Sequence, residues 1–200
     1  MLLDVLQAGE GVLRRPARPL AIEDIPGRPI QELIGHMRDT MRQAPGVGLA
    51  APQVGIPLQI AVIEDRADIL ESLDPAILAE TERRPVPFHV IINPAITLGE
   101  ETVEFFEGCL SVARFGALVP RARYVSVDCW NERAERVHIE AAGWYARILQ
   151  HEIDHLNGCL YLDRMRTRSF MTVENYGKYW KGRSVAEMRQ ALESEEAAGG

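Results

Sequence analysis

The sequence predicts an α+β fold in which antiparallel strands pack around a central helix, with an N-terminal helix and a short C-terminal helix at either end. Three observations lead to this expectation. The chain has 200 residues, the usual size of one domain. Short runs rich in β-branched residues follow one another with turn residues between them. One long segment of helical periodicity comes after these runs and carries the pattern His-Glu-x-x-His.

The N-terminal part is expected to supply an arm, a helix and a loop. Residues 1–20 are broken by glycines and prolines, which indicates an extended arm lying against the body of the protein. From 29 to 42 apolar residues recur every three or four positions, the spacing of a helix with one buried face. Glycines then interrupt regular structure over 46–55, and this loop leads into a strand at 58–64.

The middle of the chain is expected to be mostly strands. Residues 65–89 are polar and weakly patterned, which favours a surface excursion between strands. Short strands are predicted at 89–92, 102–106 and 124–129, and 137–141 is expected to return beside the last of these as a hairpin.

The long predicted helix starts near Gly143 and ends at Asn157-Gly158, a typical C-cap pair. A short helix is predicted at 185–192. We expect the whole chain, 1–200, to be one catalytic domain whose acidic tail frays at about 193–200.

The composition limits the class of protein. The chain is 46% hydrophobic and 26% charged, with a formal net charge of −7, which disfavours dedicated nucleic-acid binding. The sequence has no run of about 20 apolar residues, the length that a membrane-spanning helix needs. The first thirteen residues contain no Lys or Arg, which a signal peptide would carry at its start. The three cysteines form no CxxC pair, as in a reducing compartment. We therefore expect a cytoplasmic protein without a membrane partner.

A metal site is indicated by residues 151–155, His-Glu-Ile-Asp-His. On a helix this spacing places His151 and His155 one turn apart, where both can bind one ion. Glu152, next to the first ligand, can act as a general base. The alternative is a pair of surface histidines, but the helical stripe that holds them is otherwise apolar, which favours a metal.

A catalytic metal site usually takes three protein ligands and keeps one position open, and the sequence offers three candidates for the third ligand. Tyr161 lies at the metzincin offset, but a neutral phenol is a poor substitute for imidazole. Glu174 has the position that a zinc endopeptidase would use. The Cys109 thiolate would suit a borderline divalent ion. Cys129 and Cys159 are expected to be small apolar side chains. A non-catalytic structural metal also stays open, although structural zinc normally has four protein ligands.

Three segments together resemble a known family. Residues 46–53 (GVGLAAPQ), 107–111 (EGCLS) and 150–155 (QHEIDH) look like the ordered motifs GxGxAAxQ, EGCxS and QHExxH of peptide deformylases. The resemblance runs from about Gly46 to Asp163, more than half of the chain. It implies a metal-dependent hydrolase that removes the formyl group from N-formylmethionyl nascent peptides and releases formate.

The resemblance also assigns roles. Cys109, His151 and His155 would bind one divalent ion, with Fe²⁺ expected as the native metal and Zn²⁺, Ni²⁺ or Co²⁺ as alternatives. Glu152 would accept the proton of the attacking water. The Gln53 side chain and the backbone N–H of Leu110 would donate to the oxyanion.

Substrate contacts are expected around these motifs. Gly46 and Gly48 allow the backbone to approach a substrate closely. The walls of a methionine pocket would come from Val47, Phe105, Trp144 and Ile148, although Trp144 and Ile148 fit a plain core role equally well. Glu107 is expected either to orient a motif residue or to form a surface ion pair. Nascent substrates imply transient proximity to the ribosome, but the segment after Val185 is net acidic, which argues against docking through the tail.

Overall fold

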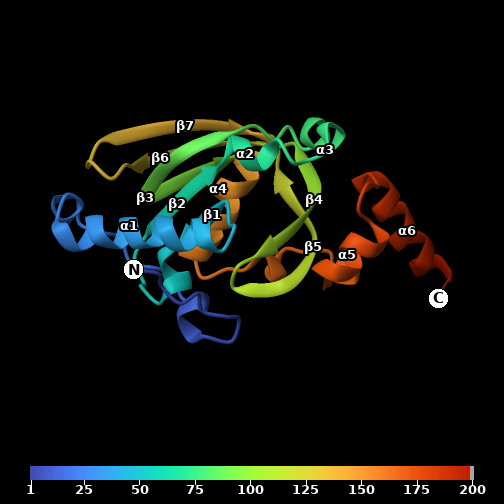
Figure 1. Cartoon of the computed structure of the whole chain (residues 1–200), viewed down its shortest axis with the longest axis horizontal. Helices are drawn as coiled ribbons and strands as arrows, with labels where there is room; N and C mark the ends of the chain where they lie inside the picture. The colour runs from blue at the N-terminus through green and yellow to red at the C-terminus, as the bar shows by residue number, and fades with distance from the viewer. Residues whose placement is uncertain (199–200) are drawn as a thin grey trace.

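The computed structural model describes the backbone of residues 1–198 and the side chains of residues 1–191, and shows helices combined with two antiparallel sheets (Figure 1). The five-stranded sheet has the order β1-β2-β3-β6-β7, formed by β1 (Gly48–Ala50), β2 (Ile60–Asp65), β3 (Val86–Leu98), β6 (Tyr124–Trp130) and β7 (Arg136–Ala142). The three-stranded sheet has the order β4-β5-β8, formed by β4 (Thr102–Cys109), β5 (Val112–Ala122) and β8 (Met171–Thr172).

Six α-helices and several short 3-10 helices connect and cover the strands of the described chain. The α-helices are α1 (Arg28–Gln43), α2 (Ala67–Leu70), α3 (Pro75–Glu80), α4 (Gly143–Leu156), α5 (Val173–Tyr179) and α6 (Val185–Ala198). The 3-10 helices are η1 (Gly11–Arg14), η2 (Ile22–Asp24), η3 (Ala51–Val54), η4 (Tyr161–Asp163) and η5 (Thr167–Ser169).

The β1–β2 end of the five-stranded sheet is buried on both faces, whereas β6 and β7 alternate between more buried and more exposed residues. Successive strand residues point to opposite faces. Ile60 and Val62 therefore pack in one cluster with the apolar face of α1, while Ala61 and Ile63 pack in a second cluster with α4. This explains the nearly continuous apolar run of β2, which is typical of a strand covered on both sides.

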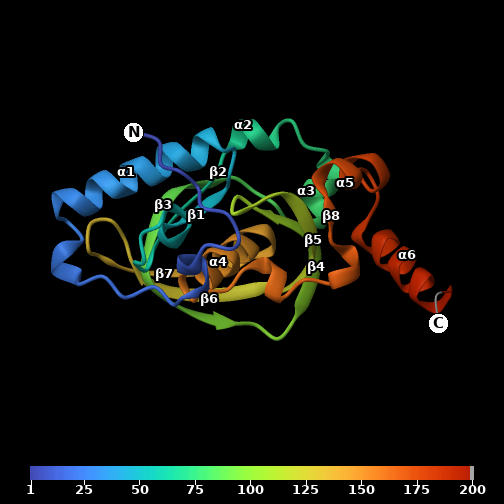
Figure 2. The ribbon, with the colours of Figure 1, turned by 90° about the horizontal axis from the view of Figure 1, so that it is seen from below.

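Helix α4 contacts strands of both sheets and lies between them in Figure 2. It ends at a cap in which Gly158 has a φ of 75°. A Cβ at Gly158 would lie 2.8 Å from backbone atoms of Arg14 and Arg15, so glycine is needed here for both conformation and space. The N-terminal arm therefore packs directly against the end of this helix, and the Ala17 N–H donates to the Leu156 carbonyl at 2.8 Å.

Several predicted elements are confirmed. Helix α1 coincides with the predicted helix at 29–42, and α4 with the one that starts at Gly143. Strands β6 and β7 form the predicted hairpin, with Val127 opposite Ile139. The C-terminal helix begins at Val185 as expected and continues to Ala198. Fraying was predicted for residues 193–200. Residues 193–198 belong to α6, and residues 199–200 lie outside the described part of the chain.

Two predicted loops were partly wrong. The glycine-rich stretch at 46–55 contains β1, whose Gly48 pairs with Ile63 of β2, because glycine with an extended backbone can still join a ladder. The polar stretch at 65–89 contains α2 and α3, and β3 already begins at Val86. A short helix with a side-chain cap is possible here because the Asp74 carboxylate accepts from the Ala76 N–H at 2.8 Å.

Strand β5 was missed entirely because glycine and proline obscure its pattern. It pairs with β4 from Thr102 opposite Ala122 down to Cys109 opposite Val112. A Cβ at Gly116 would lie 2.5 Å from the Phe106 ring, so the glycine allows the strands to approach rather than breaking them.

Among the described residues, no helix is long and apolar enough to cross a membrane.

Candidate active site

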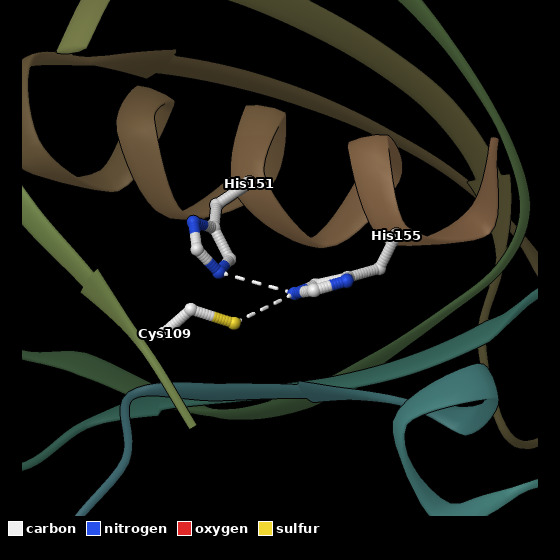
Figure 3. Close-up of side chains that lie close together, drawn as sticks. All are labelled: Cys109, His151 and His155. Atoms are coloured by element: carbon white, nitrogen blue, oxygen red, sulfur yellow. Dashed lines mark hydrogen bonds between the residues drawn. The ribbon is translucent and has the colours of Figure 1, made fainter. Parts of the chain in front are cut away.

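Three potential metal ligands from two distant parts of the chain meet at one point (Figure 3). His155 Nε2 lies 3.2 Å from Cys109 Sγ and 3.2 Å from His151 Nε2. The ligand atoms of all three lie within 4.8 Å of one another. Among the described residues this is the one such cluster of His, Cys, Asp and Glu side chains.

The local fold explains this convergence. His151 and His155 are four residues apart on α4, so they share one face of the helix. Cys109 is the last residue of β4, where the chain turns through Leu110-Ser111 into β5. The Ser111 N–H lies 3.3 Å from Cys109 Sγ and donates to it, which fixes the sulfur at the turn.

Glu107 anchors the first histidine within a buried ionic network. Its Oε1 lies 2.6 Å from His151 Nδ1 and 2.6 Å from Arg121 Nη2, and its Oε2 accepts from Arg147 Nη1 at 2.8 Å. The three charged side chains of Glu107, Arg121 and Arg147 are at most 5% exposed. Since Nδ1 of His151 is engaged by Glu107, its Nε2 is the nitrogen that faces the cluster.

A second carboxylate extends this network. Asp154 on α4 is paired with Arg121 and with Arg164, whose Nε lies 2.7 Å from Asp154 Oδ2. Burial alone would raise the pKa of Glu107, but the hydrogen bond and charge of His151 and the charge of Arg121 hold that pKa well below its usual range. Glu107 is therefore a carboxylate at neutral pH.

The two histidines have opposite protonation tendencies. Burial opposes the charge on His151, but hydrogen bonds to Cys109 and Glu107 raise its pKa well above the usual value. Burial lowers the pKa of His155, and the nearby charge of His151 lowers it further. The hydrogen bonds of His151 to Glu107 and Cys109 therefore favour a positive charge beside the cluster.

Glu152 points into the same site. It is 3% exposed, and its Oε2 has no hydrogen-bond partner among the described residues. Burial raises the pKa of Glu152 to about 7, a value suited to proton transfer near neutral pH. A Cβ at Gly48 would lie 2.2 Å from Glu152 Oε1, so β1 can approach this carboxylate only because residue 48 is glycine.

The Gln53 side chain is held in a defined orientation. Its Oε1 accepts from the Ala50 N–H at 2.8 Å, and its Nε2 donates to Ser111 Oγ at 3.2 Å. The same Nε2 lies 3.6 Å from Cys109 Sγ. An amide N–H donor therefore stands beside the cluster in a fixed position.

The N-terminal arm supports this region, a role that no pattern in residues 1–20 predicted. The Leu6 N–H donates to the Gln53 carbonyl and the Ala8 N–H to the Ser111 carbonyl, both at 2.8 Å. The Gln7 side chain donates to the Leu110 carbonyl at 3.0 Å. The arm thus ties together the two segments that carry Gln53 and Leu110.

A cavity of about 280 Å³ opens over the cluster. Most of the residues predicted for the site line it: Gly46, Val47, Gly48, Gln53, Cys109, Leu110, Trp144, Ile148, His151 and Glu152. His155 lies beneath the cavity and Phe105 does not reach it, because the Arg147 guanidinium covers the Phe105 ring at 5.1 Å and forms the wall itself.

Sequence reasoning missed the other lining residues, namely Pro45, Gly108, Arg114, Phe115, Arg147 and Val173, and named Glu107 only as a residue behind the site. One signal was available for Arg147. It lies one turn before His151 on a helix predicted to be buried, and a charge in that position requires a buried partner. Nothing in the sequence indicated that Arg114 or Phe115 would reach the site.

The other candidate ligands are placed elsewhere. Glu174 is exposed on α5 and is not part of the cluster. Tyr161 packs against Ala117 and Val119. Cys129 is buried in the core between the sheet and α4.

Comparisons with known proteins give a consistent result. The family model described as polypeptide deformylase matches residues 2–170. Peptide deformylase 1A, chloroplastic, of Solanum lycopersicum is 46% identical over 173 residues, which cover 86% of this chain and 62% of that protein. Peptide deformylase 3 of Streptomyces avermitilis is 45% identical over 179 residues, covering 89% of this chain and 78% of that protein.

Among solved structures, the Met-Ala-Ser-bound class I type b peptide deformylase from Acinetobacter baumannii superposes with a TM-score of 0.73 at 32% identity. The match covers 82% of this chain and 99% of that one. The chain spans less than two thirds of the length of the tomato relative.

Proposed function

Because the chain belongs to the polypeptide deformylase family, we propose that it is a metal-dependent amide hydrolase that removes the formyl group from N-formylmethionyl peptides. The observation that carries the proposal is the meeting of Cys109 Sγ with Nε2 of His151 and His155 at the foot of a cavity. The buried carboxylate of Glu152 lies beside them, and its Oε2 accepts no hydrogen bond from the described part of the chain. The zinc endopeptidase with Glu174 as third ligand is not favoured, since Glu174 is exposed and outside this cluster.

The donor set suits a divalent ion. One sulfur and two imidazole nitrogens suit a borderline divalent ion. We propose Fe²⁺ as the native ion because the resemblance to peptide deformylases implies it, with Zn²⁺, Ni²⁺ or Co²⁺ able to replace it. The peptide deformylase family is metal-dependent, and Cys109, His151 and His155 would hold the ion here. Such an ion, when bound, supplies Lewis acidity, which polarises the formyl carbonyl and makes water a better nucleophile.

The remaining chemistry falls to side chains of this chain. Glu152 accepts a proton from the attacking water and returns it to the departing amine nitrogen, so that formate and a free α-amino group result. A pKa near 7 lets this carboxyl group serve in both directions. Gln53 Nε2 and the Leu110 N–H are the proposed donors to the oxyanion that develops on the formyl oxygen.

The cavity fits the first residue of such a substrate. Its apolar walls include Val47, Trp144 and Ile148, which suit an unbranched methionine side chain. Gly46 and Gly48 line the same cavity, and their backbone at the edge of β1 is the proposed contact for the substrate backbone. The Acinetobacter structure contains Met-Ala-Ser, the peptide that remains after a formylated tripeptide loses its formyl group.

Further expectations belong to this proposal. We infer that the strands surround α4 as the central helix of one catalytic domain, supported by the contacts of α4 with both sheets. Nascent chains are the proposed natural substrates, which implies transient proximity to the ribosome. A cytoplasmic location is supported by three cysteines that form no disulfide bond.

Formate release from formyl-Met-Ala-Ser by anaerobically purified protein tests the function. We expect turnover by the wild type, and an inactive Glu152→Ala variant that still binds metal. Unchanged turnover by Glu152→Ala would remove Glu152 from the mechanism. Metal-loaded wild-type protein without any formate release would refute the proposed function.

A further inference from the structure

A bulge in β5 shapes one side of the cavity mouth. Gly108 and Cys109 are neighbours on β4, yet they face Gly116 and Val112, which are four residues apart on β5. The three residues between Val112 and Gly116 therefore have no partners on β4. Bulges of this kind occur beside active sites, where they redirect side chains.

At the centre of the bulge, Arg114 has a φ of 70°. This left-handed conformation costs a non-glycine residue roughly 1–2 kcal/mol. The structure thus holds an arginine in an unfavourable backbone conformation at a position that lines the cavity. Such strain is often found at functional sites.

The bulge also brings an apolar surface to the mouth. Phe115 is 38% exposed and stacks on Phe170, with ring centroids 5.0 Å apart and planes at 9°. Phe115 pairs with Thr172 of β8, the strand that leads into α5 (Figure 2). Val173, the first residue of α5, is 50% exposed and lines the same cavity. The cavity therefore runs from the buried metal-ligand cluster to an exposed rim, which we define as Arg114, Phe115, Phe170 and Val173.

No described side chain among residues 1–191 compensates the charge on this rim. Arg114 makes no ion pair and no side-chain hydrogen bond with any residue whose side chain is described. The two other arginines near the site differ, because Arg121 and Arg147 are buried and bound to Glu107. Arg114 is thus a free cation at the point where a bound peptide would leave the cavity.

We propose that this rim binds the residues that follow methionine in the substrate, and that Arg114 makes the enzyme favour an acidic over a basic side chain there. This inference rests on the proposed deformylase function. Side chains of an extended peptide alternate in direction, so the preference belongs to one of positions two and three rather than to both. An exposed ion pair contributes little, so we expect about a two- to fivefold preference that weakens in high salt.

The test compares kcat/KM for formyl-Met peptides with amidated C-termini that carry Glu or Lys at the second or the third residue. Each rate is divided by that of the same protein variant on the peptide with alanine at both positions. The wild type should favour Glu over Lys at one of the two positions. Arg114→Asn, which tolerates a left-handed backbone, should abolish the preference, and Arg114→Asp should reverse it.

Arg28→Gln is the matched control, since Arg28 is an exposed arginine in the first turn of α1 and does not line the cavity. It should keep the wild-type preference. Equal relative rates for Glu and Lys peptides in the wild type, or an unchanged preference in Arg114→Asn, would overturn the inference while leaving the deformylase function intact. A wild type that turns over none of the peptides, the alanine peptide included, would instead overturn the proposed function.

Discussion

Replacing Glu107 by glutamine tests whether the buried ionic network holds both the fold and the metal site. The substitution keeps the shape of the side chain and removes its charge. Three cationic partners then lose their common carboxylate: His151, Arg121 and Arg147. Each of these contacts is buried, so water cannot replace the missing charge.

The expected loss of stability depends on which partners Arg121 and Arg147 keep when the Glu107 carboxylate is removed. Breaking a buried ion pair typically costs about 3–5 kcal/mol. Arg121 keeps Asp154, and Arg147 keeps the carbonyls of Val119 and Val103 at 2.9 and 3.0 Å. We therefore expect a loss near the lower limit, about 3 kcal/mol. For a chain of this size that lowers Tm by about 6–12 °C.

Urea unfolding of the metal-free protein measures this loss without a contribution from metal binding. Metal titration of the same variant should show affinity lower by about 10- to 100-fold, since Glu107 orients His151. Glu101→Gln is the control, because Glu101 pairs with Arg123 at the surface and its side chain is 52% exposed. That control should lose less than about 1 kcal/mol. A Glu107→Gln variant as stable as the control, with unchanged metal affinity, would refute the reasoning.

Three further substitutions separate the other roles. Gln53→Leu should lower kcat by about 100- to 1,000-fold with metal content unchanged, because its donor acts on charge that develops in the transition state; an effect on KM alone would contradict this role. Gly48→Ala should cost about 100-fold in activity, since its Cβ would collide with the Glu152 carboxylate. Gly35→Ala should be silent, because apart from the neighbouring backbone of α1 its Cβ would meet no described atom within 4 Å; equal activity of the two variants would argue against the collision. Burial lowers the pKa of His89, which faces the Tyr145 hydroxyl, the Pro87 carbonyl and the charge of Glu132. Protonation of His89 therefore favours unfolding. When the pH is lowered from about 7.5 to about 5, the Tm of His89→Gln should fall by less than the Tm of the wild type. Equal falls in Tm would exclude His89 as a cause.

The parts of the fold that follow from local periodicity were predictable. The apolar spacing of α1 and α4 and the turn between β6 and β7 are properties of neighbouring residues. Strand β5 was not predictable in this way, because Gly116 is explained only by Phe106 on the strand opposite. Its bulge likewise depends on pairing with two different strands.

The candidate site shows the same division. Spacing alone placed His151 and His155 on one helical face with Glu152 beside the first of them, and the three ordered motifs brought in Cys109 and Gln53. The partners of Glu107 come from β5 and α4, so their association is a property of the folded chain. Phe105 was predicted to line the cavity, but in the folded chain Arg147 lies over its ring and lines the cavity instead. Local sequence patterns could not predict this contact, because the two residues are distant in sequence.

X-ray absorption at the metal edge of the zinc-loaded protein tests the central claim most directly. We predict one sulfur at about 2.3 Å, two imidazole nitrogens at about 2.0–2.1 Å and one light-atom ligand from solvent. Cys109→Ala should remove the sulfur signal. A spectrum without sulfur in the wild type, or with four ligands from the protein, would contradict the account.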